Sequence, residues 1–381
     1  MKSKVYYWCP FIDKVATVRS VLNSSYALAK YDNLLDPVIL NTCGEWTPYK
    51  DEIKKSGVKL EYLTKANILP IKKIKGGFIL SRLLYLLIIV KTTYPLFKFL
   101  KKNQNNYIIV HLLTSLPLFL NLILRKKSKI VLRISGLPKL TYIRKLLWEL
   151  SIKKLEIVFC PTETTKIYLE NIFPSYKNKF KVLRDPIINI KDIQKLKNQE
   201  SEKIDKEYFV SIGRFTKQKN YMFLLKFLNN YYKKKDLNFF FYIVGEGEKE
   251  YELKEYIKKN NLKKYVKILE YKKNIFPLLK NAKCLISTAL WEDPGFTLIE
   301  SGYLNIPVIS SDCPNGPIEF LSNGNGGFLY ESNNVESMVK TFEQYIQSNN
   351  TDLKKKVIRA KKEVKNYTMF SHYSKLIEIL N

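Results

Sequence analysis

The sequence predicts an α/β protein built from two doubly wound parallel sheets, and three observations lead to this prediction. Short runs of β-branched and aromatic residues alternate with longer helical patterns, as in successive βα units. The 381 residues are too many for one hydrophobic core and suit two domains. A charged stretch with few large apolar residues, 189–206, separates two such series of elements. We therefore expect two domains that face each other across a cleft.

The first domain is expected to comprise residues 1–188, with helices at 15–31, 114–125, 139–153 and 164–172. Its expected strands are 4–8, 37–40, 107–111, 129–134, 156–160 and 181–183. Residues 189–206 are expected to link it to a second domain, 207–365. The expected strands there are 208–212, 239–244, 266–269, 284–287, 308–310 and 327–330. The closing helical region, 338–380, is long enough for its last part, about 366–381, to cross back to the first domain.

The net charge of +30 narrows the choice of partners. Lysine and arginine recur between Tyr62 and Trp148, but that stretch contains neither aspartate nor glutamate. A general bias toward lysine explains the many basic residues but not the missing acidic ones. Such a positive surface attracts nucleic acid, an anionic membrane or a phosphorylated substrate.

Residues 76–102 favour the membrane among these partners. The apolar run between Arg82 and Lys91 is shorter than the roughly 20 residues that a spanning helix needs. A basic, aromatic-rich segment of this kind suits a helix that lies among lipid headgroups, and the alternative is a buried helix with a basic exposed face. Five scattered cysteines favour a reducing compartment, and no apolar signal segment follows the first lysines. We expect a cytoplasmic protein, peripheral on the inner face of the cell membrane.

The loop 213–220 follows a predicted strand of the second domain, where ligands of parallel sheets bind. Gly213 permits a tight exit from the strand, so Arg214 and Lys219 can both point into the cleft. A planar guanidinium and a compact ammonium form a cationic pair that suits a diphosphate. The alternative is that both side chains are simply solvated.

The loop and helix at 290–300, LWEDPGFTLIE, follow another predicted strand. A helix that begins near Gly295 exposes the amides of Phe296 and Thr297, which makes a phosphate site. Glu292 lies ahead of this helix and Glu300 lies more than one turn inside it. The two carboxylates are thus separated along a ligand, one for a sugar hydroxyl and one for a ribose hydroxyl. The alternative is that Asp293 and Glu292 only cap the helix and that Glu300 is solvated.

Three further features lie outside these two loops. Gly245 and Gly247 lack the third glycine of a dinucleotide fingerprint, so a structural turn is the better interpretation. The loop 310–319 suits a structural or a functional role equally. His111 closes a predicted strand, and this position at the cleft favours function, whereas His372 lies in an ordinary helical context. The sequence contains no hydrolase elbow, metal-ligand spacing or Walker loop, so nothing supports those enzyme classes.

Together these residues resemble the retaining GT-B glycosyltransferases of family 4, in the group that builds bacterial surface polysaccharides. The segment from Glu292 to Glu300 matches the family's E-x7-E motif, and GRFTKQKN at 213–220 resembles its G-R-x4-K phosphate loop. NGNGGFLY at 323–330 resembles the continuation of the motif. In the first half, the resemblance depends on stretches such as VHLLTSLPLFL and LRISGLPK.

The resemblance implies two Rossmann-like domains and transfer of a hexose or N-acetylhexosamine from a nucleotide-sugar, with UDP as the expected nucleotide. The acceptor would be a glycan or a polyprenyl-linked saccharide in capsule, O-antigen or lipooligosaccharide synthesis. No metal or cofactor is implied, because cationic side chains and a helix terminus neutralise the leaving group. The residues implied to bind the donor are Arg214, Lys219, Glu292, Gly295, Phe296, Thr297 and Glu300. Those implied in catalysis are His111, Arg214, Lys219 and Glu292.

Two other classes of function remain as alternatives. A basic nucleic-acid-binding protein would account for the charge and the many aromatic residues. It would not account for Glu292 and Glu300 following Arg214 and Lys219 in ordered loops, so we expect no nucleic-acid partner. A GT-B enzyme of another reaction, such as a nucleotide-sugar epimerase or a phosphorylase, would share the same fold.

Overall fold

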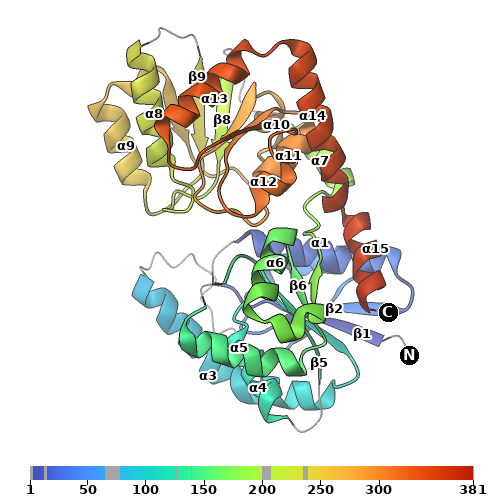
Figure 1. Cartoon of the computed structure of the whole chain (residues 1–381). Coiled ribbons are helices and arrows are strands. Elements are labelled where there is room, and N and C mark those ends of the chain that lie inside the picture. The colour runs from blue at the N-terminus through green and yellow to red at the C-terminus, as the bar shows by residue number, and fades with distance from the viewer. Residues whose placement is uncertain are drawn as a thin grey trace. The chain divides into compact units, whose positions relative to one another are not determined.

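A computed structural model describes residues 3–12, 15–64, 78–124, 128–138, 140–199, 207–234 and 239–380. The chain forms two compact units (Figure 1). Unit 1 comprises Met1–Pro186 and Met369–Asn381, and unit 2 comprises Ile187–Thr368. Each unit is a parallel sheet with helices on both faces, so the predicted fold class is confirmed.

The sheet of unit 1 has seven strands in the order β3-β2-β1-β4-β5-β6-β7. The strands are β1 (Ser3–Trp8), β2 (Leu35–Asn41), β3 (Lys59–Tyr62), β4 (Tyr107–Val110), β5 (Lys129–Arg133), β6 (Ile157–Cys160) and β7 (Phe180–Val182). The helices are α1 (Ala16–Tyr31), α2 (Lys50–Lys55), α3 (Phe78–Lys102), α4 (Ser115–Ile123), α5 (Tyr142–Lys154), α6 (Glu163–Ile172) and α15 (Met369–Leu380).

Alternate residues of strands β1, β2, β4, β5 and β6 enter different apolar layers, as the period of a strand requires. Tyr6 and Trp8 of β1 pack in the layer that α3, α4, α5 and α6 cover. Val5 and Tyr7 pack in the layer that α1, α2 and α15 cover. Because α15 packs against α1, the end of the chain belongs to the first unit.

The sheet of unit 2 has six strands in the order β10-β9-β8-β11-β12-β13. The strands are β8 (Tyr208–Ile212), β9 (Phe240–Val244), β10 (Val266–Leu269), β11 (Cys284–Ser287), β12 (Val308–Ser311) and β13 (Phe328–Tyr330). The helices are α7 (Ile190–Leu196), α8 (Tyr221–Lys234), α9 (Glu250–Lys259), α10 (Phe276–Lys280), α11 (Phe296–Leu304), α12 (Gly316–Phe320), α13 (Val335–Gln347) and α14 (Asn350–Val364).

The structure differs from the prediction at the presumed linker, and it resolves the closing helical region into separate helices. Residues 190–196 form helix α7, whose Ile193 is buried in the core of unit 2, while 200–206 lie outside the described residues. The closing region divides into three helices, because α13 ends before Ser348 and α14 ends before Lys365. The edge strand β3 was not predicted, because its residues lack the buried apolar pattern of the other strands.

Candidate functional site

The order of the strands in unit 2 reverses between β8 and β11, which is where open parallel sheets bind ligands. The loops after these two strands carry the residues singled out in the sequence. Three hydrogen bonds join the loops: Leu290 N donates to Gln218 O (2.8 Å), Gln218 Nε2 donates to Trp291 O (2.9 Å), and Thr288 Oγ1 donates to Lys219 O (2.9 Å). The structure thus brings 213–220 and 288–295 together as one edge of unit 2.

Glycine is required in the loop after β8 because other groups pass close to its backbone. A Cβ on Gly213 would lie 2.8 Å from the hydroxyl of Tyr221 and 3.0 Å from Cε of Lys219. A Cβ on Gly245 would lie only 2.0 Å from Gly213 O, and one on Gly247 would lie 2.6 Å from Phe215 O. Gly245 and Gly247 therefore form a structural turn, which lets the loop after β9 contact the loop after β8.

Lys219 and Glu292 form an ion pair across the two loops. The side chain of Glu292 is 8% exposed and that of Lys219 is 19% exposed. Glu292 is not a helix cap, because Gly295 occupies the N-cap position of α11. Its carboxylate is instead held by the ammonium that was expected to bind phosphate, so a donor would have to share Lys219 with it.

Arg214 behaves differently from Lys219. Its side chain is exposed, and no described carboxylate lies within ion-pair distance of it. Arg214 is therefore available for an anionic ligand. The expectation that both cations point into one site stays a prediction.

The start of α11 has the form expected of an anion site. Gly295 adopts φ +95°, a conformation that favours glycine, and has no side chain to cap the helix. The amides of Phe296 and Thr297 have no backbone acceptor among the described residues. Glu300 is 2% exposed, so the alternative of a solvated helix residue is wrong.

The loop 312–316 supports the Glu292 loop from behind. Gly316 N donates to Glu292 O (3.0 Å), and Asn315 Nδ2 donates to Asp293 Oδ2 (3.3 Å). A Cβ on Gly316 would lie 1.9 Å from Pro294 O, so no other residue fits there without a shift of backbone. Of the two roles left open for this loop, the structure supports the structural one.

The enclosed space at this edge is small. A hollow of about 10 Å³ lies among Lys219, Tyr221, Ser287, Thr288 and Thr297, together with Ile212 and Ile286. That is about the space of one water molecule. This hollow is therefore too small for a nucleotide-sugar.

His111 occupies the equivalent position in unit 1. The strand order of unit 1 reverses between β1 and β4, and His111 follows β4, with its amide donating to Trp8 O (2.9 Å). The residue is 6% exposed, and its Nε2 has no hydrogen-bond partner among the described residues. Burial, and then the positive charge of Arg133, holds the pKa of His111 well below its usual range, so the imidazole is neutral at pH 7.

Sequence reasoning missed a buried polar group near this histidine. Arg133 at the end of β5 forms an ion pair with Asp185 (2.8 Å), and Ser20 of α1 donates to the same carboxylate. The other histidine, His372 of α15, lies 2.8 Å from Ser24 Oγ and 2.7 Å from Arg184 O. It joins α15 to α1, a structural role. The only indication of this polar group in the sequence is the position of Arg133 at the end of a predicted strand.

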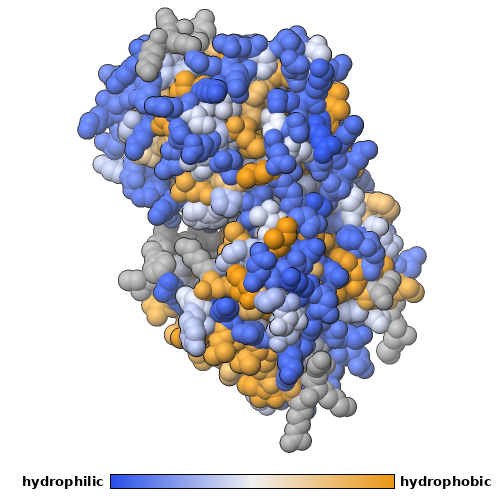
Figure 2. All heavy atoms as spheres, in the orientation of Figure 1, coloured by the Kyte–Doolittle hydropathy of each residue, from blue (hydrophilic) through white to orange (hydrophobic). Residues whose placement is uncertain are grey.

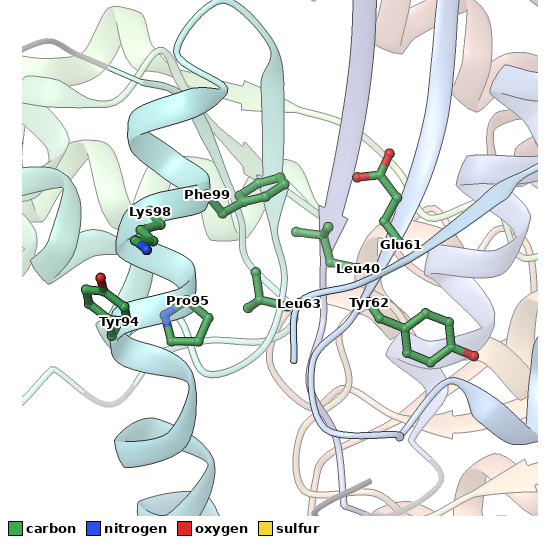
Figure 3. A pocket seen from close by; sticks show the side chains of 8 residues that line it. All are labelled: Leu40, Glu61, Tyr62, Leu63, Tyr94, Pro95, Lys98 and Phe99. Carbon is green, nitrogen blue, oxygen red and sulfur yellow. The ribbon is translucent and has the colours of Figure 1, made fainter. Parts of the chain in front are cut away.

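Unit 1 also contains a larger hollow, of about 370 Å³, beside helix α3 (Figure 3). One wall comes from α3, with Pro95 and Phe99 facing Leu40 and Leu63 across the hollow, and Tyr94 and Lys98 at its rim. Glu61 and Tyr62 of β3 complete the lining. The space is thus mainly apolar. Among the described residues of both units, no group of three or more histidine, cysteine, aspartate or glutamate residues is placed to hold a metal ion.

Comparison with known proteins relates the chain to glycosyltransferases. Residues 192–364 match the family model "Glycosyl transferases group 1". The chain is 32% identical over 256 residues to an uncharacterised glycosyltransferase of Methanocaldococcus jannaschii, covering 61% of this chain and 62% of that protein. It is 27% identical over 316 residues to a UDP-Gal:alpha-D-GlcNAc-diphosphoundecaprenol alpha-1,3-galactosyltransferase of Escherichia coli, covering 75% of this chain and 76% of that protein.

The fold is shared with solved structures. The HepE protein of Anabaena, solved in complex with UDP and glucose, superposes with a TM-score of 0.70 at 14% sequence identity, covering 99% of each chain. At this identity the likeness concerns the fold alone. The matching segment spans only about three fifths of the Methanocaldococcus protein, 62% of its length. The chain has the GT-B fold, and its residues 192–364, nearly all of unit 2, belong to the group 1 glycosyl transferases.

Proposed function

We propose that this protein is a retaining, metal-independent glycosyltransferase of family 4 that transfers a hexose or N-acetylhexosamine from a UDP-sugar. One observation carries the proposal. At the switch point of unit 2, the Lys219–Glu292 pair lies beside the uncapped start of α11, with exposed Arg214 on the neighbouring loop. This is a cationic edge with a buried carboxylate, which suits a sugar diphosphate.

In the proposed reaction, the bond between the anomeric carbon and the diphosphate oxygen breaks, and the acceptor oxygen forms the new bond on the same face of the sugar. Arg214, Lys219 and the amides of Phe296 and Thr297 stabilise the charge that develops on the diphosphate. The leaving diphosphate oxygen takes the proton of the acceptor hydroxyl. Gly295 lets the chain approach the phosphate closely.

The two carboxylates and the histidine receive separate roles. Glu292, held by Lys219, accepts a hydrogen bond from a hydroxyl of the donor sugar, and Glu300 accepts one from the ribose. His111 is neutral and has a free Nε2 among the described residues, so it can hydrogen-bond a sugar hydroxyl without adding charge near the developing cation.

The acceptor that we propose is a glycan or a polyprenyl-linked saccharide in the synthesis of a bacterial surface polysaccharide such as capsule, O-antigen or lipooligosaccharide. Support comes from the Escherichia coli relative, whose name specifies a UDP-galactose donor and a diphosphoundecaprenol-linked acceptor. We propose a cytoplasmic location for the reaction, because UDP-sugars are cytoplasmic metabolites and the five described cysteines are free.

The proposal is tested by measuring the melting temperature with and without UDP. We expect UDP to raise it in the wild-type protein and not in Arg214→Ala, because a ligand that binds only the native state stabilises it. Lys217→Ala is the matched control, since Lys217 is an exposed cation of the same loop. Arg214 is preferred to Lys219 for this test, because removing Lys219 would leave Glu292 buried without its partner.

If no nucleoside diphosphate changes the melting temperature, the proposal fails. The same assay with short single-stranded DNA or RNA tests the nucleic-acid alternative, for which we expect no shift. Separation of the products distinguishes transfer from epimerisation, since transfer releases UDP and epimerisation leaves the nucleotide-sugar intact.

A further inference from the structure

Helix α3 has two apolar stripes, and only one of them packs in the core of unit 1. Ile88, Leu96 and Leu100 are fully buried, at a spacing that puts them along one side of the helix. A second set of apolar residues, which are exposed, lies on roughly the opposite side of the helix, as follows from 3.6 residues per turn. The second stripe includes Leu83 and Val90, which are 56% and 66% exposed. A helix with one apolar stripe would have sufficed for the core.

The second stripe has the spacing of a helix that docks on an apolar phase. It consists of Leu83, Leu86, Leu87, Val90 and Tyr94, which are 38–66% exposed. Residues spaced by three and four positions line one face of a helix. Leaving such a row in water is unfavourable, and contiguous exposed apolar surface marks interaction sites.

The apolar surface continues over the two neighbouring helices. Helix α4 contacts both α3 and α5. It exposes Phe119 and Ile123, and α5 exposes Tyr142, Ile143 and Leu146. Figure 2 shows hydrophobic surface gathered over the part of unit 1 that these three helices occupy in Figure 1. We call the exposed apolar residues of α3, α4 and α5 the three-helix surface.

The charges around the three-helix surface are almost all positive. Every exposed charged side chain of α3 from Leu80 onward is basic: Arg82, Lys91, Lys98, Lys101 and Lys102. Helix α5 adds exposed Lys145 and Lys153, and Glu149 is the exception. An apolar surface bordered by cations is complementary to the acyl region and the anionic headgroups of a phospholipid bilayer. A soluble acidic protein would match the cations but not the apolar row.

The length of α3 does not make it a spanning helix. Leu80–Lys102 is long and apolar enough by composition to cross a membrane, with 22% of its most apolar window buried. If it left the sheet, however, Ile88, Leu96 and Leu100 would lose their place in the core of unit 1. The buried stripe therefore keeps α3 on the protein, and the exposed stripe faces outward from it.

We propose that the three-helix surface docks unit 1 on an anionic phospholipid bilayer. This inference deepens the proposed function, because it names the surface through which a lipid-linked acceptor arrives. In βα units the helix N-termini lie at the carboxyl edge of the sheet. The exposed apolar residues of α3 and α5 lie mostly in the N-terminal parts of these helices, and His111 follows β4 at the same edge. The apolar hollow beside Tyr94 extends this surface inward along α3 (Figure 3).

Flotation with vesicles tests this inference. We expect the wild-type protein to float with phosphatidylcholine vesicles that contain phosphatidylglycerol and to float less with pure phosphatidylcholine. The triple variant Leu83→Gln, Leu86→Gln, Val90→Gln should lower the ratio of bound to free protein by at least about tenfold, because each side chain removes apolar contact with lipid. The matched control is Tyr251→Gln, Ile346→Gln, Ile358→Gln, three exposed apolar residues of unit 2, which should float like the wild type.

A second pair of variants tests the charge. Lys91→Glu with Lys98→Glu should abolish the preference for phosphatidylglycerol, and Lys226→Glu with Lys340→Glu in unit 2 should preserve it. The shift of melting temperature by UDP, measured on every variant, shows that each is folded and separates failure of docking from failure of the proposed function. Wild-type protein that does not float, or controls that lose flotation equally, would overturn the inference. So would a wild-type dimer that the triple variant dissociates without any vesicle binding, since the surface would then join two copies.

Discussion

The two units have the same architecture but protect their polar residues in different ways. Both sheets reverse strand order at one point, and both candidate sites lie there, at β1 and β4 in unit 1 and at β8 and β11 in unit 2. Unit 2 keeps an ion pair, Lys219–Glu292, at the edge of the sheet and packs its loops by backbone contact at glycines. Unit 1 buries two neutral histidines near an Arg133–Asp185 pair.

This difference explains why the candidate site of unit 2 can be predicted from the sequence, whereas that of unit 1 cannot. Tight loops need glycine and proline at fixed spacing, so the site of unit 2 leaves a motif in the chain. The site of unit 1 depends on single residues at strand ends, which only the fold brings together. The same unit carries the three-helix surface.

The largest effect on stability is expected from the ion pair of unit 1. Asp185→Asn leaves Arg133, whose side chain is 2% exposed, buried without its charge partner. We expect a loss of about 3–5 kcal/mol in the free energy of unfolding, measured by urea denaturation. Glu292→Gln should cost less, because Lys219 is 19% exposed and its flexible stem can reach water. Equal losses of unfolding free energy in the two variants would contradict the stronger burial of the Arg133–Asp185 pair as the cause.

Acid should also affect the units unequally. The chain has two histidines, both in unit 1. Burial lowers the pKa of His372 to about 4, against about 6.5 in the unfolded chain, so the unfolded state binds a proton that the folded state refuses. The stability from this group is complete above pH 6.5 and is lost as the pH falls toward 4, by about 3 kcal/mol. His111 acts in the same direction.

Tryptophan fluorescence can follow this loss, since Trp8, Trp46 and Trp148 are buried in unit 1 and Trp291 of unit 2 is 43% exposed. We expect the urea concentration at the midpoint of unfolding, measured by the fluorescence of the buried tryptophans, to be lower at pH 5 than at pH 7. The fall should be smaller in His372→Gln. An unchanged pH dependence in that variant would remove His372 as the cause.

The smallest expected effect is a difference in stability between alanine variants of two glycines that have nearly the same φ angle. Gly136 in unit 1 has φ +159° and Gly245 in unit 2 has φ +155°. A Cβ on Gly136 would meet no described atom within 4 Å, whereas one on Gly245 would lie 2.0 Å from Gly213 O. Gly245→Ala should therefore cost about 1–3 kcal/mol more than Gly136→Ala, because the backbone of the loop must shift. Thermal unfolding of the two variants measures the difference.

The sequence predicted the fold more completely than it predicted the site. Three strands of unit 2, including β8 and β10, have the predicted bounds, because continuous apolar runs between turn residues mark buried parallel strands. Strand β3 was missed, since an edge strand with few buried residues has no such signal. For α3 the sequence left a helix among lipid headgroups and a buried helix both open, because a pattern with apolar residues on two sides does not say which side packs.

The candidate site was predicted as residues but not as contacts. The resemblance pointed to Lys219 and Glu292, 73 positions apart, but nothing in their spacing said that they pair with each other. The burial of Glu300 likewise follows from how α11 packs on the sheet. Arg133 and Asp185 belong to no motif, and their pairing depends on the order of the strands in space.

The most direct test of the account is turnover of nucleotide-sugars by the wild type, Arg214→Ala and Lys217→Ala. A screen of UDP-sugars with a lipid-linked saccharide acceptor should identify a donor whose sugar is transferred with retention of anomeric configuration. With that donor, Arg214→Ala should lower kcat/KM by about 10²–10³-fold, as expected for a group that stabilises the leaving diphosphate. Lys217→Ala should change it by less than about twofold, because its exposed charge lies outside the proposed contacts. Equal losses in both variants, or no transfer from any nucleotide-sugar, would contradict the account.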